Sequence, residues 1–138
     1  MDKKQASAVK AAGLRDEIHQ FAKQIREKVY GAKGHPEWGT LFSEIEELGV
    51  QVGDAVCREF VQQGAAEQAA KAEEHCPDQS CPTCKGPLEP RDPEPKTVLT
   101  RRGEVGWNEP QSFCKKCRKA FFPSVQKFGH AGKRQLQP

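Results

Sequence analysis

The sequence lacks long apolar runs and is poor in hydrophobic residues overall. No stretch of 18 apolar residues occurs in the 138-residue chain, so no transmembrane helix and no membrane association are expected. Hydrophobic residues make up 36% of the chain and charged residues 30%, which does not predict one large core. These proportions favour elongated helices together with a small domain that needs a crosslink for stability.

An apolar leader and an evident catalytic pattern are missing as well. The first residues, MDKKQASAVK, are charged and no apolar core follows them, so no signal peptide is expected and the chain is predicted to be cytoplasmic. Thiols stay reduced there, and paired cysteines are more often metal ligands or catalysts than disulfides. No paired carboxylates, nucleophile–base arrangement or phosphate-binding loop stands out, so neither an enzyme nor a small-molecule substrate is expected.

Charge is divided unevenly along the chain. Residues 1–78 carry 10 Lys/Arg and 14 Asp/Glu, a net charge of −4, whereas residues 79–138 carry 12 Lys/Arg and 5 Asp/Glu, a net charge of +7. The asymmetry favours a polyanionic partner for the C-terminal half. The alternative is that lysines keep a small domain soluble.

Apolar residues recur at helical spacing through the N-terminal half. The first stripe predicts a helix from about residue 5 to Tyr30 that ends at Gly31, and the second predicts a helix from Pro36 to about Glu74. The first stripe comprises Leu14, Ile18, Phe21, Ile25 and Val29, and the second comprises Trp38, Leu41, Ile45, Leu48, Val52, Val56 and Phe60.

Two such helices predict an antiparallel helical hairpin over residues 1–75, packed along Leu14/Ile18/Phe21/Ile25 and Leu41/Ile45/Leu48/Val52. The aromatic residues Trp38, Phe42 and Phe60 are interpreted as helix packing, and Cys57 as a small core residue beside Val56 and Phe60. A hairpin buries little by itself, so its stripes are expected to seek a third partner. That partner is either a second copy, giving a homodimer through the hairpin, or a missing domain.

Composition changes at HCPDQSCPTC, which begins a second module over residues 76–125. Glu89 to Pro95 is interpreted as a polar connection, and KTVLTRRGEVGW as a β-hairpin with its turn at Arg102-Gly103. AFFP is expected to form a short closing strand, and residues 126–138 a flexible tail. The fold class is therefore predicted as α+β, a helical hairpin followed by a small antiparallel β zinc ribbon.

Four cysteines in two Cys-x-x-Cys pairs, Cys81/Cys84 and Cys114/Cys117, predict one structural zinc ion per chain. Iron in the same four-thiolate shell remains an alternative. A redox site would need one such pair near a βαβ pattern, and a disulfide would need an oxidising compartment. Cys76, His75 and His130 are weaker ligand candidates.

Basic residues lie beside the second cysteine pair and in the hairpin turn. They predict contact with a nucleic-acid backbone. The candidate residues are Arg101, Arg102, Lys115, Lys116, Arg118 and Lys119. Aromatic residues interleave with them, and the preferred interpretation is that these rings form the core of the ribbon. The interleaved rings are Trp107, Phe113, Phe121 and Phe122.

The ordered motifs CPTCKG, VLTRRGEV and CKKCRKAFFP resemble the N-terminal zinc-binding segment of Kra-type insertion-sequence transposases and transposase-like relatives. The resemblance covers about residues 36–125. Position by position it matches Cys81 and Cys84, then Thr100, Arg101, Gly103, Glu104 and Val105, then Cys114, Cys117, Phe121, Phe122 and Pro123. The departure is Lys85, which separates the first knuckle from Gly86.

The resemblance implies a helical N-terminal region, a zinc knuckle, a hairpin and a second knuckle. In that family a catalytic domain of the ribonuclease-H type follows, whereas residues 126–138 contain no Asp or Glu, so no catalysis is expected here. Two hypotheses follow. One is a non-catalytic DNA-binding module of low sequence specificity, a truncated or stand-alone remnant of a transposase. The other is a zinc-stabilised adaptor or dimerisation module.

Overall fold

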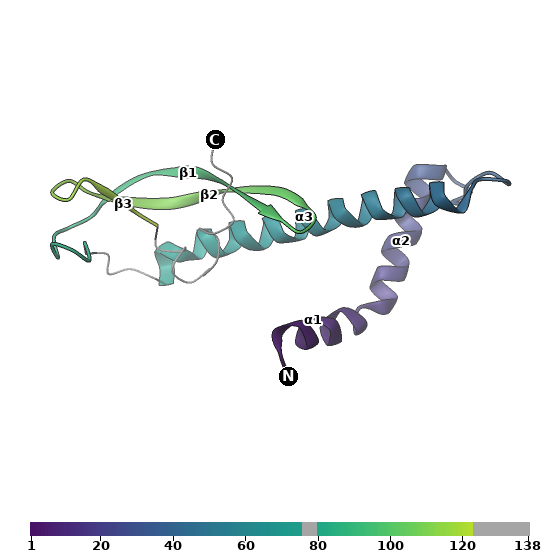
Figure 1. The fold of residues 1–138 in the computed structure, drawn as a ribbon, viewed down its shortest axis with the longest axis horizontal. Coiled ribbons are helices and arrows are strands. Elements are labelled where there is room, and N and C mark those ends of the chain that lie inside the picture. Colours follow the sequence, from purple (N-terminus) through teal and green to yellow (C-terminus); the bar gives the residue numbers. More distant parts are fainter. Residues whose placement is uncertain (76–79, 123–138) are drawn as a thin grey trace. The chain divides into compact units, whose positions relative to one another are not determined.

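A computed structural model describes residues 1–75 and 80–122 (Figure 1). Three helices precede a three-stranded antiparallel sheet, which confirms the α+β class. Within the described ranges no helix has both the length and the apolar character needed to cross a bilayer. The predictions for Cys76, His130 and the tail 126–138 fall outside these ranges, as does the side chain of His75.

The chain divides into two compact units, Met1–Glu46 and Glu47–Pro138. The division lies inside the third helix, whereas the sequence places a boundary at residue 75, where the composition changes.

The N-terminal unit begins with two helices where the sequence predicts one. Helix α1 spans Lys3–Ala12 and α2 spans Arg15–Tyr30. A capping box starts α1, since the Asp2 carboxylate accepts from the Gln5 backbone at 2.7 Å and the Gln5 side chain accepts from the Asp2 backbone at 3.1 Å. The prediction of one helix is wrong because Gly13, a weak helix former, ends α1. The predicted end of α2 before Gly31 is confirmed.

The apolar stripe of α2 faces solvent. Neither α1 nor α2 has a buried residue, and Leu14, Ile18 and Phe21 are 50%, 53% and 44% exposed. Leu41 and Ile45, from the second predicted stripe, are also exposed. The packing of these two stripes as a hairpin therefore stays a prediction.

Helix α3 spans Phe42–His75 and starts later than predicted. Pro36 does not occupy its first turn, because Gly39 has a φ of 91° and the Thr40 hydroxyl donates to the Glu37 carbonyl at 2.7 Å. Trp38 is thereby left outside the helix and fully exposed. The end of α3 falls within a residue of the predicted position.

In the second unit α3 packs on the sheet through alanines. Ala65, Ala69 and Ala72 are 2%, 1% and 5% exposed and recur at helical spacing. The apolar stripe predicted from sequence does not include these alanines. The interpretation of Phe60 as helix packing and of Cys57 as a core residue is wrong, since Phe60 is 79% exposed and Cys57 is only half-buried.

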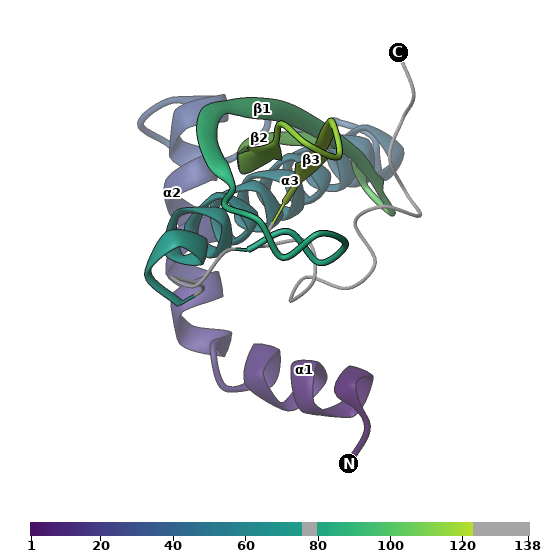
Figure 2. The ribbon, with the colours of Figure 1, turned by 90° about the vertical axis from the view of Figure 1, so that its left-hand side faces the viewer.

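The sheet has the order β1-β2-β3, with β1 at Glu89–Thr100, β2 at Gly103–Cys114 and β3 at Lys119–Phe121. The two-residue turn between β1 and β2 confirms the predicted hairpin, and β3 confirms the closing strand. Val98 pairs with Val105, and both are buried. Figure 2 shows the ribbon of β1 and β2 lying over one side of α3.

The interpretation of Glu89 to Pro95 as a connection is wrong, since these residues form the first half of β1. Proline cannot donate to a sheet ladder, but β1 is an edge strand, where one side of the backbone needs no strand partner. A shift in register between Arg91 and Glu94 accommodates the residues between them.

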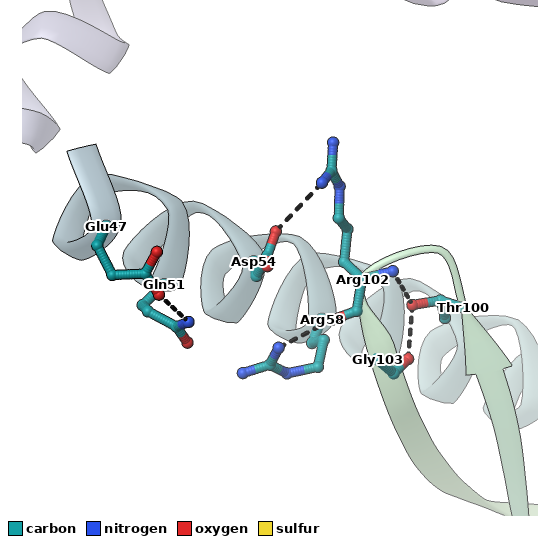
Figure 3. Close-up of polar contacts among 7 residues, drawn as sticks. All are labelled: Glu47, Gln51, Asp54, Arg58, Thr100, Arg102 and Gly103. Carbon is teal, nitrogen blue, oxygen red and sulfur yellow. Dashed lines mark hydrogen bonds and ion pairs between the residues drawn. The ribbon is translucent and has the colours of Figure 1, made fainter. Parts of the chain in front are cut away.

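The hairpin turn is held against α3 by Arg58 and Asp54 (Figure 3). The Arg58 guanidinium donates to the Arg102 carbonyl at 2.8 Å, and the Arg102 guanidinium lies 3.6 Å from the Asp54 carboxylate. Gly103 has a φ of 121°, and a Cβ there would lie 2.9 Å from Cδ of Arg58. The backbone conformation of the turn therefore requires glycine, and a Cβ at this position would also displace the Arg58 side chain.

Candidate metal centre

Two turns of the same design carry the four predicted ligands. Cys81 and Cys84 lie in the turn before β1, where the Lys85 N–H donates to the Cys81 carbonyl at 2.8 Å. Cys114 ends β2 and Cys117 lies in the following turn, where the Arg118 N–H donates to the Cys114 carbonyl at 2.7 Å. Glu89 at the start of β1 pairs with Phe113 near the end of β2, so the two turns meet at the same end of the sheet.

Both turns place a cationic residue in the left-handed backbone region. Lys85 has a φ of 62° and Arg118 a φ of 55°, and among the described residues no other non-glycine residue has a positive φ. A side chain with a Cβ costs roughly 1–2 kcal/mol in this conformation. Lys85, which departs from the pattern of the resembled family, therefore occupies a position that glycine adopts without strain.

The four sulfur atoms lie close together. The Sγ atoms of Cys81 and Cys117 are 3.7 Å apart, those of Cys84 and Cys114 are 3.6 Å apart, and all four lie within 4.8 Å of one another. A metal–sulfur distance of about 2.3 Å gives a tetrahedron with edges of about 3.8 Å. The four predicted ligands therefore lie together at spacings compatible with a bound metal ion.

Backbone N–H groups face the sulfurs. Gly86 donates to the sulfur of Cys84 and Cys117 donates to that of Cys114, both at 3.4 Å. A hydrogen bond from the Cys84 backbone is the main cause that lowers the pKa of the Cys81 thiol to about 6, against the raising effect of burial. The hydrogen bond with Cys81 raises the pKa of the Cys117 thiol to about 12. Without metal this pair therefore retains one proton over a wide pH range.

Burial leaves little room for a substrate at these sulfurs. Cys81 and Cys114 are buried and Cys84 and Cys117 are half-buried. Four sulfurs complete a tetrahedral shell, and a closed shell holds structure, whereas a catalytic metal keeps an open position. Cys57 lies on α3 and is not part of this cluster.

The predicted basic residues form two groups rather than one surface. Arg101 and Arg102 lie at the hairpin turn, whereas Lys115, Lys116, Arg118 and Lys119 lie beside the cysteines, at the opposite end of the sheet (Figure 1). The 12 residues of β2 separate the groups by roughly 35 Å. Two of these six cations form ion pairs, Arg102 with Asp54 and Lys115 with Glu89.

The aromatic rings are half-buried, and cations of the chain itself lie over two of them. The Arg91 guanidinium lies 3.7 Å from the centre of the Phe113 ring, and Lys96 Nζ lies 3.9 Å from that of Phe122. These contacts agree with the interpretation of the rings as part of the ribbon, because the covered ring faces are not open to a nucleic-acid base.

Three residues on this unit were missed by sequence reasoning. Arg58 and Gln62 of α3 bind the backbone of the hairpin, the latter by accepting from the Gly106 N–H at 3.1 Å. Glu109 is 1% exposed, and its Oε2 accepts from Trp107 Nε1 at 2.5 Å, while its Oε1 has no hydrogen-bond partner within the described residues. The sequence could not indicate these contacts. Arg58 and Gln62 bind residues 44 positions further along the chain, and Glu109 is notable only because it is buried.

The chain matches no protein-family model, no curated protein sequence and no solved structure. The transposase resemblance therefore stays a prediction.

Proposed function

We propose that this chain is a non-catalytic zinc-ribbon module that binds duplex DNA with low sequence specificity, through the cations at the metal-bound end of its sheet. Zinc is the proposed ion because it takes four thiolates in a tetrahedral structural site without redox chemistry. Its task is to hold the two turns together so that their cations face the same partner.

The observation that carries the proposal is a set of exposed cations around the four cysteines. They have no ion-pair partner in the part of the chain that the structure describes, so they remain free to meet phosphate. The set, called the knuckle cations below, consists of Lys85, Lys116, Arg118 and Lys119. A zinc ion with four thiolates has a formal charge of −2, so these four cations leave the end of the sheet positive.

The hairpin turn supplies a second, weaker contact. Arg101 is exposed there, roughly 35 Å from the knuckle cations by the length of β2. One turn of duplex DNA advances about 34 Å. Both ends of the sheet can therefore reach the backbone of one duplex, and the expected footprint is about one helical turn.

The test is DNA affinity as a function of salt for the zinc-loaded full chain, measured by fluorescence anisotropy with a labelled duplex of about two helical turns. Changing all four knuckle cations to Gln is expected to weaken binding at low salt and to flatten the slope of log K against log salt by up to about 0.9 per lost contact. Glutamine keeps the side-chain length and the backbone strain at Lys85 and Arg118 comparable.

The matched control removes four positive charges from the other unit, by changing Lys3, Lys4, Lys10 and Lys23 to Gln. Its affinity is expected to change little. The proposal fails if the knuckle variant binds like the parent, or if both variants lose affinity equally, because the second result would show only a response to net charge.

The second candidate is the adaptor. It is favoured by the exposed apolar residues of α2 and α3, among them Ile18, Phe21 and Phe60.

A further inference from the structure

Strand β2 has a free edge over most of its length. Strand β3 pairs with it only at Ser112–Cys114, and no other described strand lies on that side. The Gly106 N–H donates to Gln62 Oε1 of α3 at 3.1 Å, so it points away from β1. Backbone groups of alternate residues in an antiparallel strand point to the same edge, and those of Asn108 and Pro110 therefore point away from β1 as well. Among the described residues, only Gln62 bonds these outward groups.

A groove of about 490 Å³ lies between this edge and α3. Successive residues of a strand send their side chains to opposite faces, so a groove lined by three residues in a row opens onto the edge of the strand, where the backbone is reached. None of the lining residues is charged, and the volume is in the range of ligand-binding sites. The walls include Gly106, Trp107 and Asn108 on the strand, and Ala66, Ala69 and Ala70 on the helix.

Strand β3 ends where this edge becomes free. Phe121, its last residue, lies opposite Ser112. Two positions further, the pair of the same type would join Pro110 to Pro123, and neither proline has an N–H to donate. The sequence therefore opposes an extension of β3 along the groove. A segment that places any other residue opposite Pro110 can donate an N–H to the Pro110 carbonyl.

We infer that an extended, uncharged segment of another protein binds in this groove by adding a strand antiparallel to the free edge of β2. Asn108 would exchange two hydrogen bonds with the residue opposite it, and the Pro110 carbonyl would accept a further one. Unpaired strand edges are templates for such an addition. A charged side chain facing the lining of the groove would find no partner of opposite charge there, which selects against charged segments.

The test is the selection of a phage-displayed library of random peptides on the immobilised zinc-loaded full chain, followed by fluorescence anisotropy with the enriched peptides. These peptides are expected to share an uncharged stretch rich in residues that favour strands. N-methylation of alternate residues in that stretch is expected to weaken binding at least tenfold for one set and little for the other, because only one set of N–H groups faces β2.

Asn108→Pro removes one outward N–H and no bond to β1. The sheet is therefore expected to persist with its metal, while peptide affinity falls at least tenfold. Asn108→Ala is the matched control, since it removes the exposed side chain but keeps the N–H, and it should bind the peptides like the parent.

Ala70→Trp fills the groove from the side of α3, where the alanine is exposed, and is expected to weaken peptide binding at least tenfold. Ala55→Trp makes the same change at an exposed position of α3 that does not line the groove, and should bind like the parent.

A library that yields no binding peptide would overturn the inference. So would peptides, acidic ones among them, that bind the Asn108→Pro or the Ala70→Trp protein as tightly as the parent. None of these changes removes a knuckle cation, so DNA binding is decided by its own experiment and each proposal can fail alone.

Discussion

The guanidinium of Arg58 on α3 hydrogen-bonds the backbone carbonyl of Arg102 in the hairpin turn, 44 positions further along the chain. It is one of the few contacts that fix the far end of the sheet to the helix. Arg58→Met keeps the aliphatic stem and removes the donor. It is expected to lower the free energy of unfolding by about 1 kcal/mol, since the group is half-buried and its bond is partly solvated. Urea unfolding of the zinc-loaded protein measures the change, and Arg101→Met, at an exposed neighbour in the turn, should be nearly neutral.

Cys84→Ser removes one corner of the sulfur tetrahedron. It is expected to abolish stoichiometric zinc binding and to unfold the sheet while part of the helical circular dichroism remains, because α1 and α2 lie outside the unit that contains the four cysteines. Elemental analysis and circular dichroism measure the two effects. Cys57→Ser is the control and should keep its metal, since Cys57 is not in the cluster. Full zinc occupancy in the Cys84→Ser protein would falsify the ligand set.

Zinc affinity is expected to rise with pH. In the metal-free protein the pKa of Cys81 is lowered to about 6 and that of Cys117 is raised to about 12, so at neutral pH the first is a thiolate and the second keeps its proton. Metal binding must displace that proton, and each proton released makes the apparent affinity rise about tenfold per pH unit. The thiolate form of Cys81 is lost as the pH falls through about 6, which weakens binding further. Competition with a chelating indicator between pH 6.5 and 7.5 measures the slope, and a flat profile would contradict this assignment.

Lys85 and Arg118 have a positive φ in the two cysteine turns, and glycine at such a position removes the backbone strain. Lys85→Gly is expected to raise the free energy of unfolding of the zinc-loaded protein by about 1 kcal/mol, because glycine adopts a positive φ without a steric cost. Lys116→Gly is the matched control. It also removes an exposed lysine, but the backbone there does not have a positive φ, so its stability should not increase. Thermal melting compares the two, and equal melting temperatures would show that position 85 is not strained.

Ala65 is a buried residue of α3 with 2% of its surface exposed. Ala65→Leu places a larger side chain at this buried position, and is expected to lower the free energy of unfolding by about 1–3 kcal/mol. Ala55→Leu makes the same change at an exposed position of α3 and should be close to neutral. If both variants melt alike, the helix does not pack on the sheet through its alanines.

The cluster of four cysteines could be predicted from sequence because its geometry is largely local. A Cys-x-x-Cys turn brings its two sulfurs close whatever surrounds it, so the spacing alone names Cys81, Cys84, Cys114 and Cys117. The same holds for the hairpin turn and for the end of α2 at Gly31. The division of the cations into two groups could not be predicted, because it depends on the length of β1 and β2.

The sheet-facing side of α3 was missed for a different reason. Periodicity marks the face with the largest apolar residues, and in α3 that face includes Val56 and Phe60, which are exposed. Alanine has a weak hydrophobic signal, although its small size allows the strands to approach the helix closely. The prolines of β1 led to the opposite error, because they predicted a connection where the structure has a strand. An edge strand tolerates proline, whereas a central strand does not.

The two sulfurs at the 3.7 Å edge of the tetrahedron, those of Cys81 and Cys117, are 36 positions apart in sequence. Closing a loop of that length in an unfolded chain costs about 3 kcal/mol of entropy. Strand pairing that starts at the two-residue turn of the β1–β2 hairpin and proceeds outward would bring the cysteine turns together in smaller steps. The ion would then arrive at a loop whose ends are already together, so metal capture would be the last step of folding, and its speed would depend on a turn roughly 35 Å away.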